Sequence, residues 1–270
     1  ICCCCGTKNI AVVKTALHIL KVGGHLVNDA DALEEVLTAF AGLEGAKLLV
    51  HGGGRHATAL AKQLGISPKM VDGRRITDAA MLEVAVMSYA GLSNKKIVSQ
   101  LQKEGVNAVG LTGADGNCIE AVKRPVTDID YGFAGDITQV NTAVFASLTA
   151  QNFVPVLCAI THDNNGQLLN TNADTIAAQV AKAMSEEYDV TLFYCFEHAG
   201  VLKDINKPEN VISKLSKEAA ETYTKAGVIH QGMVPKLHNG FDALENGVKE
   251  VVISNIAGLL DINAPKTTLI

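Results

Sequence analysis

Short apolar runs alternate with longer segments of helical spacing along the chain, and this pattern predicts an α/β protein. The runs at 16–22 and 47–51 are typical of buried strands, and each leads into consecutive glycines. Apolar positions between the two runs recur on one helical face: Leu33, Val36, Leu37 and Phe40. Asp31 and Glu34 have capping-box spacing and are expected to start that helix. A strand, a helix and a second strand in this order predict two parallel strands joined by a right-handed crossover.

The alternation continues through the rest of the chain. We expect helices over 56–64, 78–103, 143–152, 215–226 and 236–246, and one after Asp174. We expect strands over 106–111, 154–160, 190–194 and 250–253. An Asp-Gly pair predicts a hairpin over 70–77, and a Gly- and Asp-rich stretch at 118–140 predicts a second hairpin that lies over the body. No linker divides the chain, so the expected sheet is continuous, with two functional halves that meet near residues 165–170.

The composition agrees with helices that cover a parallel sheet. The 270 residues are 48% hydrophobic and include no Trp. The net charge is -5 and the basic residues are scattered, which argues against a nucleic acid as the main partner. A membrane-spanning helix needs about 18 or more consecutive apolar residues, and the sequence has no such run. We therefore expect a cytoplasmic enzyme that binds neither nucleic acid nor membrane.

The seven cysteines do not form a framework for disulfides or for a metal ion. Four of them are the run Cys2–Cys5, and adjacent cysteines are poorly placed to pair. The other three stand singly in apolar surroundings: Cys118, Cys158 and Cys195. Cys2 and Cys5 have C-x-x-C spacing, but no second ligand pair with zinc spacing follows, so no metal site is expected. Residues 1–15 are treated as an N-terminal extension, which we expect to be poorly ordered.

Two glycine turns that follow predicted strands are the main candidates for a ligand site. Gly23 and Gly24 follow the first strand, and Gly52, Gly53 and Gly54 follow the second. Open α/β sheets bind ligands beyond the carboxyl ends of their strands, where free N–H groups and helix N-termini attract anions. Each turn taken alone is also compatible with an ordinary tight connection between a strand and a helix.

The second turn matches a nucleotide-binding fingerprint only in part. Gly52-x-Gly54-x-x-Ala57 loosely fits the dinucleotide pattern, but Arg74 and Arg75 stand where a ribose-binding acid is needed. A nicotinamide dehydrogenase is therefore an alternative for which this chain lacks one required residue, the acid that binds the ribose. The sequence contains no G-x-x-x-x-G-K-[ST] motif, which excludes a P-loop nucleotidase.

Three basic side chains are candidates for binding an anion. Lys21 lies inside an apolar strand, where its charge must be paired or bound to a ligand, unless this is an edge strand from which it reaches solvent. Arg75, on the predicted hairpin, has the shape to bind a carboxylate with two hydrogen bonds, unless it is a solvated turn residue. Lys236 follows a proline where a helix begins, and taken alone it is typical of a surface residue.

Polar residues gather where the helix after residue 172 begins. Helix capping accounts for Asn172, and attraction to the helix dipole accounts for Asp174. Neither effect accounts for Asn170, which precedes the cap by two positions.

Five motifs occur in order and together resemble the amino acid kinase family. They are Lys21-x-Gly23-Gly24, His51-Gly52-Gly53-Gly54, Gly73-x-Arg75-Ile76-Thr77, Asn170-x-Asn172-Ala173-Asp174 and Gly232-Met233-x-x-Lys236. The resemblance covers about residues 17–255 and implies an open three-layer αβα sandwich with a mainly parallel central sheet of about eight strands. It also implies that residues 16–168 hold an acylated amino acid and that residues 169–270 hold ATP.

The resemblance also implies roles for residues at the matching positions. Lys21 and Lys236 would stabilise the phosphoryl group in transfer, and Asp174 would orient both lysines. Substrate-binding positions would be Gly53, Gly54, Arg75 and Asn170, and Gly23 and Gly24 would lie at the phosphates. The nucleotide loop would include Glu197, Gly200 and Leu202, with Glu197 standing where the family usually has Asp.

Within the family, the Gly73 and Asn170 motifs resemble most the branch that phosphorylates N-acetyl-L-glutamate for arginine biosynthesis. The acceptor is a γ-carboxylate that is already ionised at pH 7, so the reaction needs positioning and charge compensation rather than a general base. The resemblance implies ATP as phosphoryl donor, Mg²⁺ held mainly by the ATP phosphates, and a homodimer.

Two alternatives share the same fold. One is a kinase for another N-acylglutamate such as N-succinylglutamate, whose second carboxylate could meet Arg74. The other is a non-catalytic amino-acid-sensing module, which would be expected to lack Lys21, Lys236 or Asp174, whereas this chain keeps all three.

Overall fold

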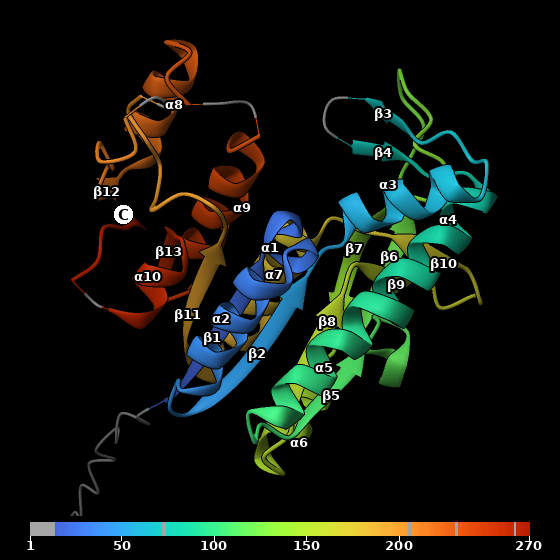
Figure 1. Ribbon diagram of the computed structural model, residues 1–270, viewed down its shortest axis with the longest axis horizontal. Coiled ribbons are helices and arrows are strands. Elements are labelled where there is room, and N and C mark those ends of the chain that lie inside the picture. Colours follow the sequence, from blue (N-terminus) through green and yellow to red (C-terminus); the bar gives the residue numbers. More distant parts are fainter. Residues whose placement is uncertain (1–13, 72–73, 205–206, 230–231, 262) are drawn as a thin grey trace, which may run out of the picture.

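A single eight-stranded sheet runs through the molecule. The computed structural model describes residues 14–71, 74–204, 207–229, 232–261 and 263–270. The strands of this sheet are β1 (Thr15–Val22), β2 (Ala46–His51), β5 (Ala108–Leu111), β8 (Val154–Cys158), β11 (Tyr188–Cys195), β12 (Lys214–Leu215), β13 (Glu250–Ser254) and β14 (Thr267–Leu269). Their order is β12-β14-β13-β11-β1-β2-β8-β5, and only the β13–β14 pair is antiparallel (Figure 1). The expected continuous, mainly parallel sheet is confirmed.

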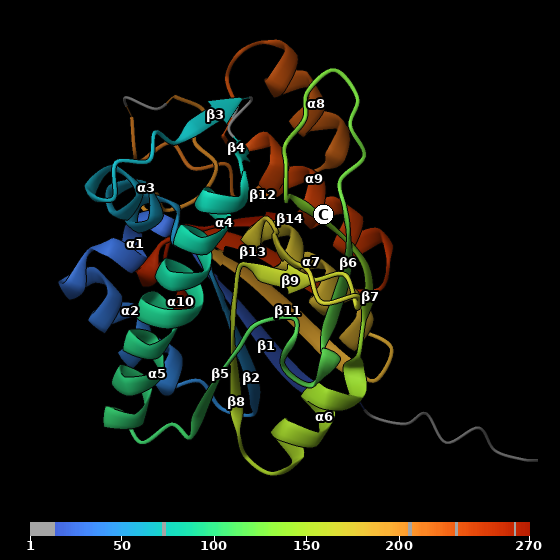
Figure 2. The ribbon, with the colours of Figure 1, turned by 90° about the vertical axis from the view of Figure 1, so that its right-hand side faces the viewer.

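Helices cover both faces of this sheet. One face carries α1 (Gly24–Asn28), α2 (Ala30–Ala41), α5 (Asn94–Lys103) and α10 (Ile256–Leu260). The other face carries α6 (Thr142–Ala150), α7 (Ala173–Met184) and α9 (Val234–Glu245), so the molecule has three layers, with the sheet between α2 and α7 (Figure 2). Three further helices are α3 (Gly54–Gln63), α4 (Ala79–Val86) and α8 (Lys217–Lys225). In the part of the chain that the structure describes, no helix is long and apolar enough to cross a membrane.

Side chains of β1 alternate between the two apolar layers, as the period of a strand requires. Leu17 and Ile19 join the cluster under α7, whereas Leu20 and Val22 join the cluster under α2. The same alternation turns Lys21 toward the α7 layer. Because β1 lies between β11 and β2, an edge-strand position for Lys21 is ruled out.

Three local predictions are wrong in detail. Asp29, rather than Asp31, caps α2: its side chain accepts a hydrogen bond from the Ala32 N–H. The helix expected over 78–103 contains a π-helical turn at Met87–Ser93. The strand expected over 154–160 ends at Cys158, and a separate strand β9 (Ile160–His162) follows. Helix α1 and strand β14 had no clear sequence signal, because both are short.

Both expected hairpins are present and lie beyond the main sheet (Figure 1). The first pairs β3 (Lys69–Val71) with β4 (Arg74–Ile76). The second pairs β6 (Ile119–Lys123) with β7 (Gly135–Val140) and is extended by β9 and β10 (Leu168–Asn170). The turn residues Asp72 and Gly73, and the run Cys2–Cys5, lie outside the described residues.

The loop that joins β6 to β7 is attached to the first hairpin at one point. Thr77 donates its backbone N–H to Tyr131 and accepts a bond from Phe133, so Gly132 between them lies directly against Thr77. This attachment holds the loop in place beside the carboxyl ends of the sheet.

Replacing Gly132 should test how tight this attachment is. Its φ is 67°, and a Cβ there would lie 2.2 Å from the Thr77 carbonyl oxygen. We expect Gly132→Ala to lower the free energy of unfolding by on the order of 3 kcal/mol in urea titrations. The matched control is Gly166→Ala, which has a φ of 93° but open space around the added methyl group, and should lose about 1 kcal/mol. Equal losses would show that the close contact is unimportant.

His51, the last residue of β2, is fully buried and should make stability depend on pH. Burial lowers the pKa of His51 from its ordinary value of 6.5 to about 4. Between these two pH values His51 is protonated in the unfolded chain but stays neutral in the folded protein, so unfolding takes up a proton. We expect the free energy of unfolding to fall by about 2 kcal/mol from pH 7 to pH 5 through this group. The measurement is chemical denaturation of the wild type against His51→Asn, and parallel pH profiles would contradict the assignment.

Candidate active site

Three charged side chains meet at the carboxyl end of β1. Lys21 Nζ lies 2.6 Å from Asp174 Oδ1, and Lys236 Nζ lies 3.1 Å from Asp174 Oδ2. The exposed fractions of the Lys21, Asp174 and Lys236 side chains are 7%, 9% and 19%. Taken alone, Lys21 had a possible solvent-facing position and Lys236 was typical of a surface residue, whereas the family resemblance implied that Asp174 orients both. The structure brings both lysines to the Asp174 carboxylate.

The pKa values of this cluster reflect burial and mutual charge. Burial lowers the pKa of Lys21, an effect that Asp174 opposes and that the charge of Lys236 reinforces. Burial by itself would raise the pKa of Asp174, but the charges and hydrogen bonds of the two lysines outweigh it and lower that pKa. Asp174 is therefore ionised at neutral pH, and two cations share its one negative charge.

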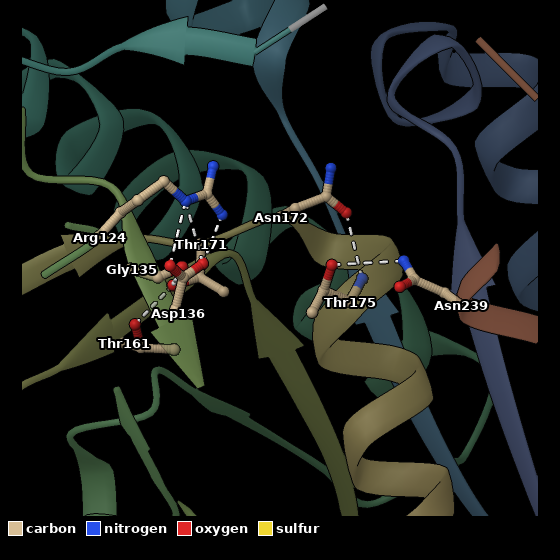
Figure 3. Close-up of polar contacts among 8 residues, drawn as sticks. All are labelled: Arg124, Gly135, Asp136, Thr161, Thr171, Asn172, Thr175 and Asn239. Carbon is tan, nitrogen blue, oxygen red and sulfur yellow. Dashed lines mark hydrogen bonds and ion pairs between the residues drawn. The ribbon is translucent and has the colours of Figure 1, made fainter. Parts of the chain in front are cut away.

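The first turn of α7 places Asp174 between the two lysines. Asn172 is the N-cap, and its Oδ1 accepts hydrogen bonds from the N–H groups of Asp174 and Thr175 at 2.8 and 3.1 Å. Asn239 on α9 donates to the Thr175 hydroxyl at 3.3 Å, which links α7 to the helix that carries Lys236 (Figure 3). Asn172 therefore acts as the cap that its sequence position predicts.

The two glycine turns lie next to each other beside this cluster. The Gly23 N–H donates to the Cys195 carbonyl at 2.9 Å, and a Cβ at Gly23 would lie 3.2 Å from that oxygen. A Cβ at Gly24 would come within 4.0 Å of the Gly54 nitrogen. Close approach to the Cys195 carbonyl accounts for glycine at position 23, whereas a methyl group at position 24 would make only an ordinary van der Waals contact.

A small cavity of about 240 Å³ opens between the second turn and the β10–α7 connection. Its lining includes Lys21, Gly53, Gly54, Arg75, Asn170 and Asp174. Arg75 Nη2 donates to the Gly54 carbonyl at 2.9 Å and to the Thr58 hydroxyl at 2.8 Å, so Arg75 is not a solvated turn residue. Asn170 donates to the Thr77 hydroxyl at 3.0 Å. Both side chains are held in position within the protein itself.

A large cavity of about 740 Å³ lies on the other side of the lysines. Lys21, Gly24 and Arg75 line both cavities, and Gly23 and Lys236 line the large one. Glu197 and Gly200 lie on its wall, which also has an apolar part formed by Val201, Leu202, Val228, Ile229 and Met233. The Val201 N–H donates to the Thr267 hydroxyl at 2.8 Å and anchors this loop to β14.

Sequence reasoning missed part of the small cavity. Arg124 and Tyr131, from the β6–β7 excursion, line it, and the Arg124 guanidinium lies 5.6 Å from the Tyr131 ring. Arg124 Nε also donates to both carboxylate oxygens of Asp136 at 3.1 Å (Figure 3). Arg74 lines the same cavity. The sequence did contain a signal for Arg124. It is a basic residue within the 118–140 stretch, which was expected to lie over the body of the protein.

No cluster of three or more His, Cys, Asp or Glu side chains that could hold a metal ion occurs among the residues described. The cationic groups that line the two cavities are the side chains of Lys and Arg residues. Such a lining suits ligands that carry several negative charges.

Comparison with known proteins identifies the family of this chain. The sequence profile described as "Amino acid kinase family" matches residues 17–255. The chain is 54% identical over 242 residues to the acetylglutamate kinase of Phocaeicola vulgatus, which covers 90% of this chain and 94% of that protein. It is 53% identical over 238 residues to the acetylglutamate kinase of Parabacteroides distasonis, with 88% and 93% covered.

A solved structure shares the fold at lower identity. The N-acetylglutamate synthase of Neisseria gonorrhoeae superposes with a TM-score of 0.77 at 23% identity, over 94% of this chain and 59% of that chain. From the profile match and these relatives, the chain belongs to the amino acid kinase family.

Proposed function

We propose that this protein transfers the γ-phosphoryl group of ATP to the γ-carboxylate of N-acetyl-L-glutamate, giving N-acetylglutamyl 5-phosphate for arginine biosynthesis. The observation that carries the proposal is the Lys21–Asp174–Lys236 cluster, which lies between a small and a large cavity. Relatives more than half identical over most of the chain are named acetylglutamate kinases, which supports this acceptor.

The acceptor occupies the small cavity, mainly against residues 16–168. Arg75 and Asn170 bind its charged and polar groups, and the N–H groups of Gly53 and Gly54 face the reacting carboxylate. A carboxylate oxygen forms a bond to the γ-phosphorus while the bond from that phosphorus to the bridging oxygen of ATP breaks. ADP leaves with the bonding electron pair, and no proton has to move.

ATP occupies the large cavity, mainly against residues 169–270. The apolar wall around Leu202 takes the base, Glu197 and Gly200 border the same loop, and Gly23 and Gly24 face the phosphates. Mg²⁺ would be held mainly by the phosphate oxygens and would offset part of their charge.

The two lysines stabilise the phosphoryl group from opposite sides. Lys21 approaches from β1 and Lys236 from α9, and Asp174 keeps their ammonium groups apart at fixed positions. Two anions that repel each other are thereby brought together, since the cations are in place before either ligand arrives.

The additional arginines of the small cavity support a second candidate for the acceptor substrate. Arg74 and Arg124 line it together with Arg75, more cationic groups than one amino-acid carboxylate needs. An N-succinylglutamate, with an extra carboxylate on its acyl group, would use one of them.

Replacing Lys236 should slow the reaction more than it weakens binding. We expect Lys236→Ala to lower kcat by about 30- to 1,000-fold, ~2–4 kcal/mol in the barrier, with a smaller change in KM for either substrate. The matched control is Lys182→Ala, because Lys182 also forms an ion pair, 2.9 Å from Asp242, and its side chain is similarly exposed. Coupled ADP-release kinetics measure both, and an unchanged kcat in Lys236→Ala would exclude the proposed role.

A panel of acceptors tests the function itself. We expect ADP release with N-acetylglutamate and MgATP, and none above background with free glutamate or aspartate. A higher kcat/KM with N-succinylglutamate, lost selectively in Arg74→Ala or Arg124→Ala, would establish the second acceptor. Absence of ADP release with all four compounds would refute the kinase proposal.

A further inference from the structure

His51 is a buried imidazole at the start of the second glycine turn, and its two ring nitrogens have different partners. Nδ1 lies 2.8 Å from the carbonyl oxygen of the next residue, Gly52. Nε2 lies 3.1 Å from the amide nitrogen of Asn94, on α5. The exposed fractions of His51 and Asn94 are 0% and 1%, so neither contact competes with solvent.

The surroundings of Asn94 determine which ring nitrogen carries the hydrogen. Its amide nitrogen also donates to the Val156 carbonyl at 2.9 Å, and its Oδ1 accepts from Lys95 Nζ at 3.0 Å, so both ends of the amide are fixed. An amide NH₂ can only donate, so His51 Nε2 accepts and Nδ1 carries the hydrogen that is donated to Gly52. Burial keeps the pKa of His51 at about 4, so the ring stays neutral with this hydrogen at physiological pH.

The hydrogen bond from His51 sets the plane of the Gly52–Gly53 peptide. This peptide is trans, so its C=O and N–H groups point to opposite sides. With the Gly52 oxygen held by the imidazole, the Gly53 N–H is turned away from His51. None of the described residues accepts a hydrogen bond from that N–H, and Gly53 lines the small cavity.

A peptide between two glycines needs such a restraint, because without side chains it can rotate at little steric cost. Helix packing restrains Gly53 from one side, since a Cβ there would lie 2.6 Å from Tyr89 Cδ1 on the π-helical turn. That contact limits space around Gly53 but does not choose the direction of the peptide. The direction comes from the hydrogen bond to His51.

We propose that His51, oriented by Asn94, is a positioning residue for phosphoryl transfer, because it turns the Gly53 N–H toward the oxygen atoms that react in the small cavity. The inference rests on the proposed kinase function. A donor fixed before the ligands bind costs no reorganisation as charge moves onto the transferred group.

Two substitutions of His51 separate this role from packing. His51→Asn keeps a donor near the Nδ1 position, whereas His51→Gln places its amide near the Nε2 position and loses the donor to Gly52. We expect His51→Gln to lower kcat with N-acetylglutamate by about 10- to 100-fold, with the KM for ATP changed less than about threefold. We expect His51→Asn to keep kcat within about fivefold of the wild-type value. Melting temperatures of both variants are recorded alongside.

A role in packing alone predicts the reverse order. Asn is smaller than Gln and leaves the larger cavity in place of the imidazole, so His51→Asn would be both the less stable and the less active variant. A kcat for His51→Asn equal to or below that of His51→Gln would overturn the proposal.

A measurement on the wild-type protein covers the case in which the variants do not fold. Nitrogen-15 spectra of the histidine rings, with the His51 ring assigned through its own backbone signals, report the tautomer of that imidazole, and we expect hydrogen on Nδ1. Hydrogen on Nε2 would overturn the inference whether or not the enzyme is active. A wild-type protein that releases no ADP with any acceptor would instead refute the proposed function, so the two failures are distinguishable.

Discussion

Two ammonium groups share one buried carboxylate, and the rest of the site depends on this arrangement. Ionised groups removed from water lose several kcal/mol of solvation each, and a good ion pair only repays that loss. Lys21 and Asp174 form such a pair, but Lys236 adds a second positive charge that interacts with the same carboxylate. The charge of the cluster is therefore balanced only in part within the protein, and an anionic ligand would complete it. Asp174 holds both ammonium groups in place in the protein without ligands.

The order of strands explains why this cluster forms where it does. Strands β1, β2, β8 and β5 lie on one side of the sheet and β11, β13, β14 and β12 on the other, so β1 and β11 meet at the junction. Open α/β sheets bind ligands beyond the carboxyl ends of strands at such a point. Lys21 comes from β1, Asp174 from the helix before β11 and Lys236 from the helix before β13. Residues from both sides of this junction line each of the two cavities, and Lys21 of the charged cluster lines both.

The sequence predicted the sheet and its helices well because burial on both faces leaves long apolar runs. Interruptions of those runs marked Lys21 and the two glycine turns, whereas Lys236 entered the candidate site only through the family resemblance. Asp29 was missed as a cap because neighbouring acids in one segment are equally good candidates and only the backbone path decides between them. Arg124, Tyr131 and Asn94 were missed because their importance comes from segments distant in the chain. Asn94, for instance, meets His51 across 43 positions.

The protein carries a net charge of -5, yet most of the charged side chains that line its two cavities are cations. A local field opposite in sign to the overall charge attracts anions to this crevice while the remaining surface repels them. Burial lowers the pKa of Lys21 in the protein without ligands, and a phosphate oxygen beside it would raise that pKa again. Binding of phosphate and retention of the lysine proton therefore reinforce each other. This coupling keeps Lys21 protonated, and therefore positively charged, while an anion is bound beside it.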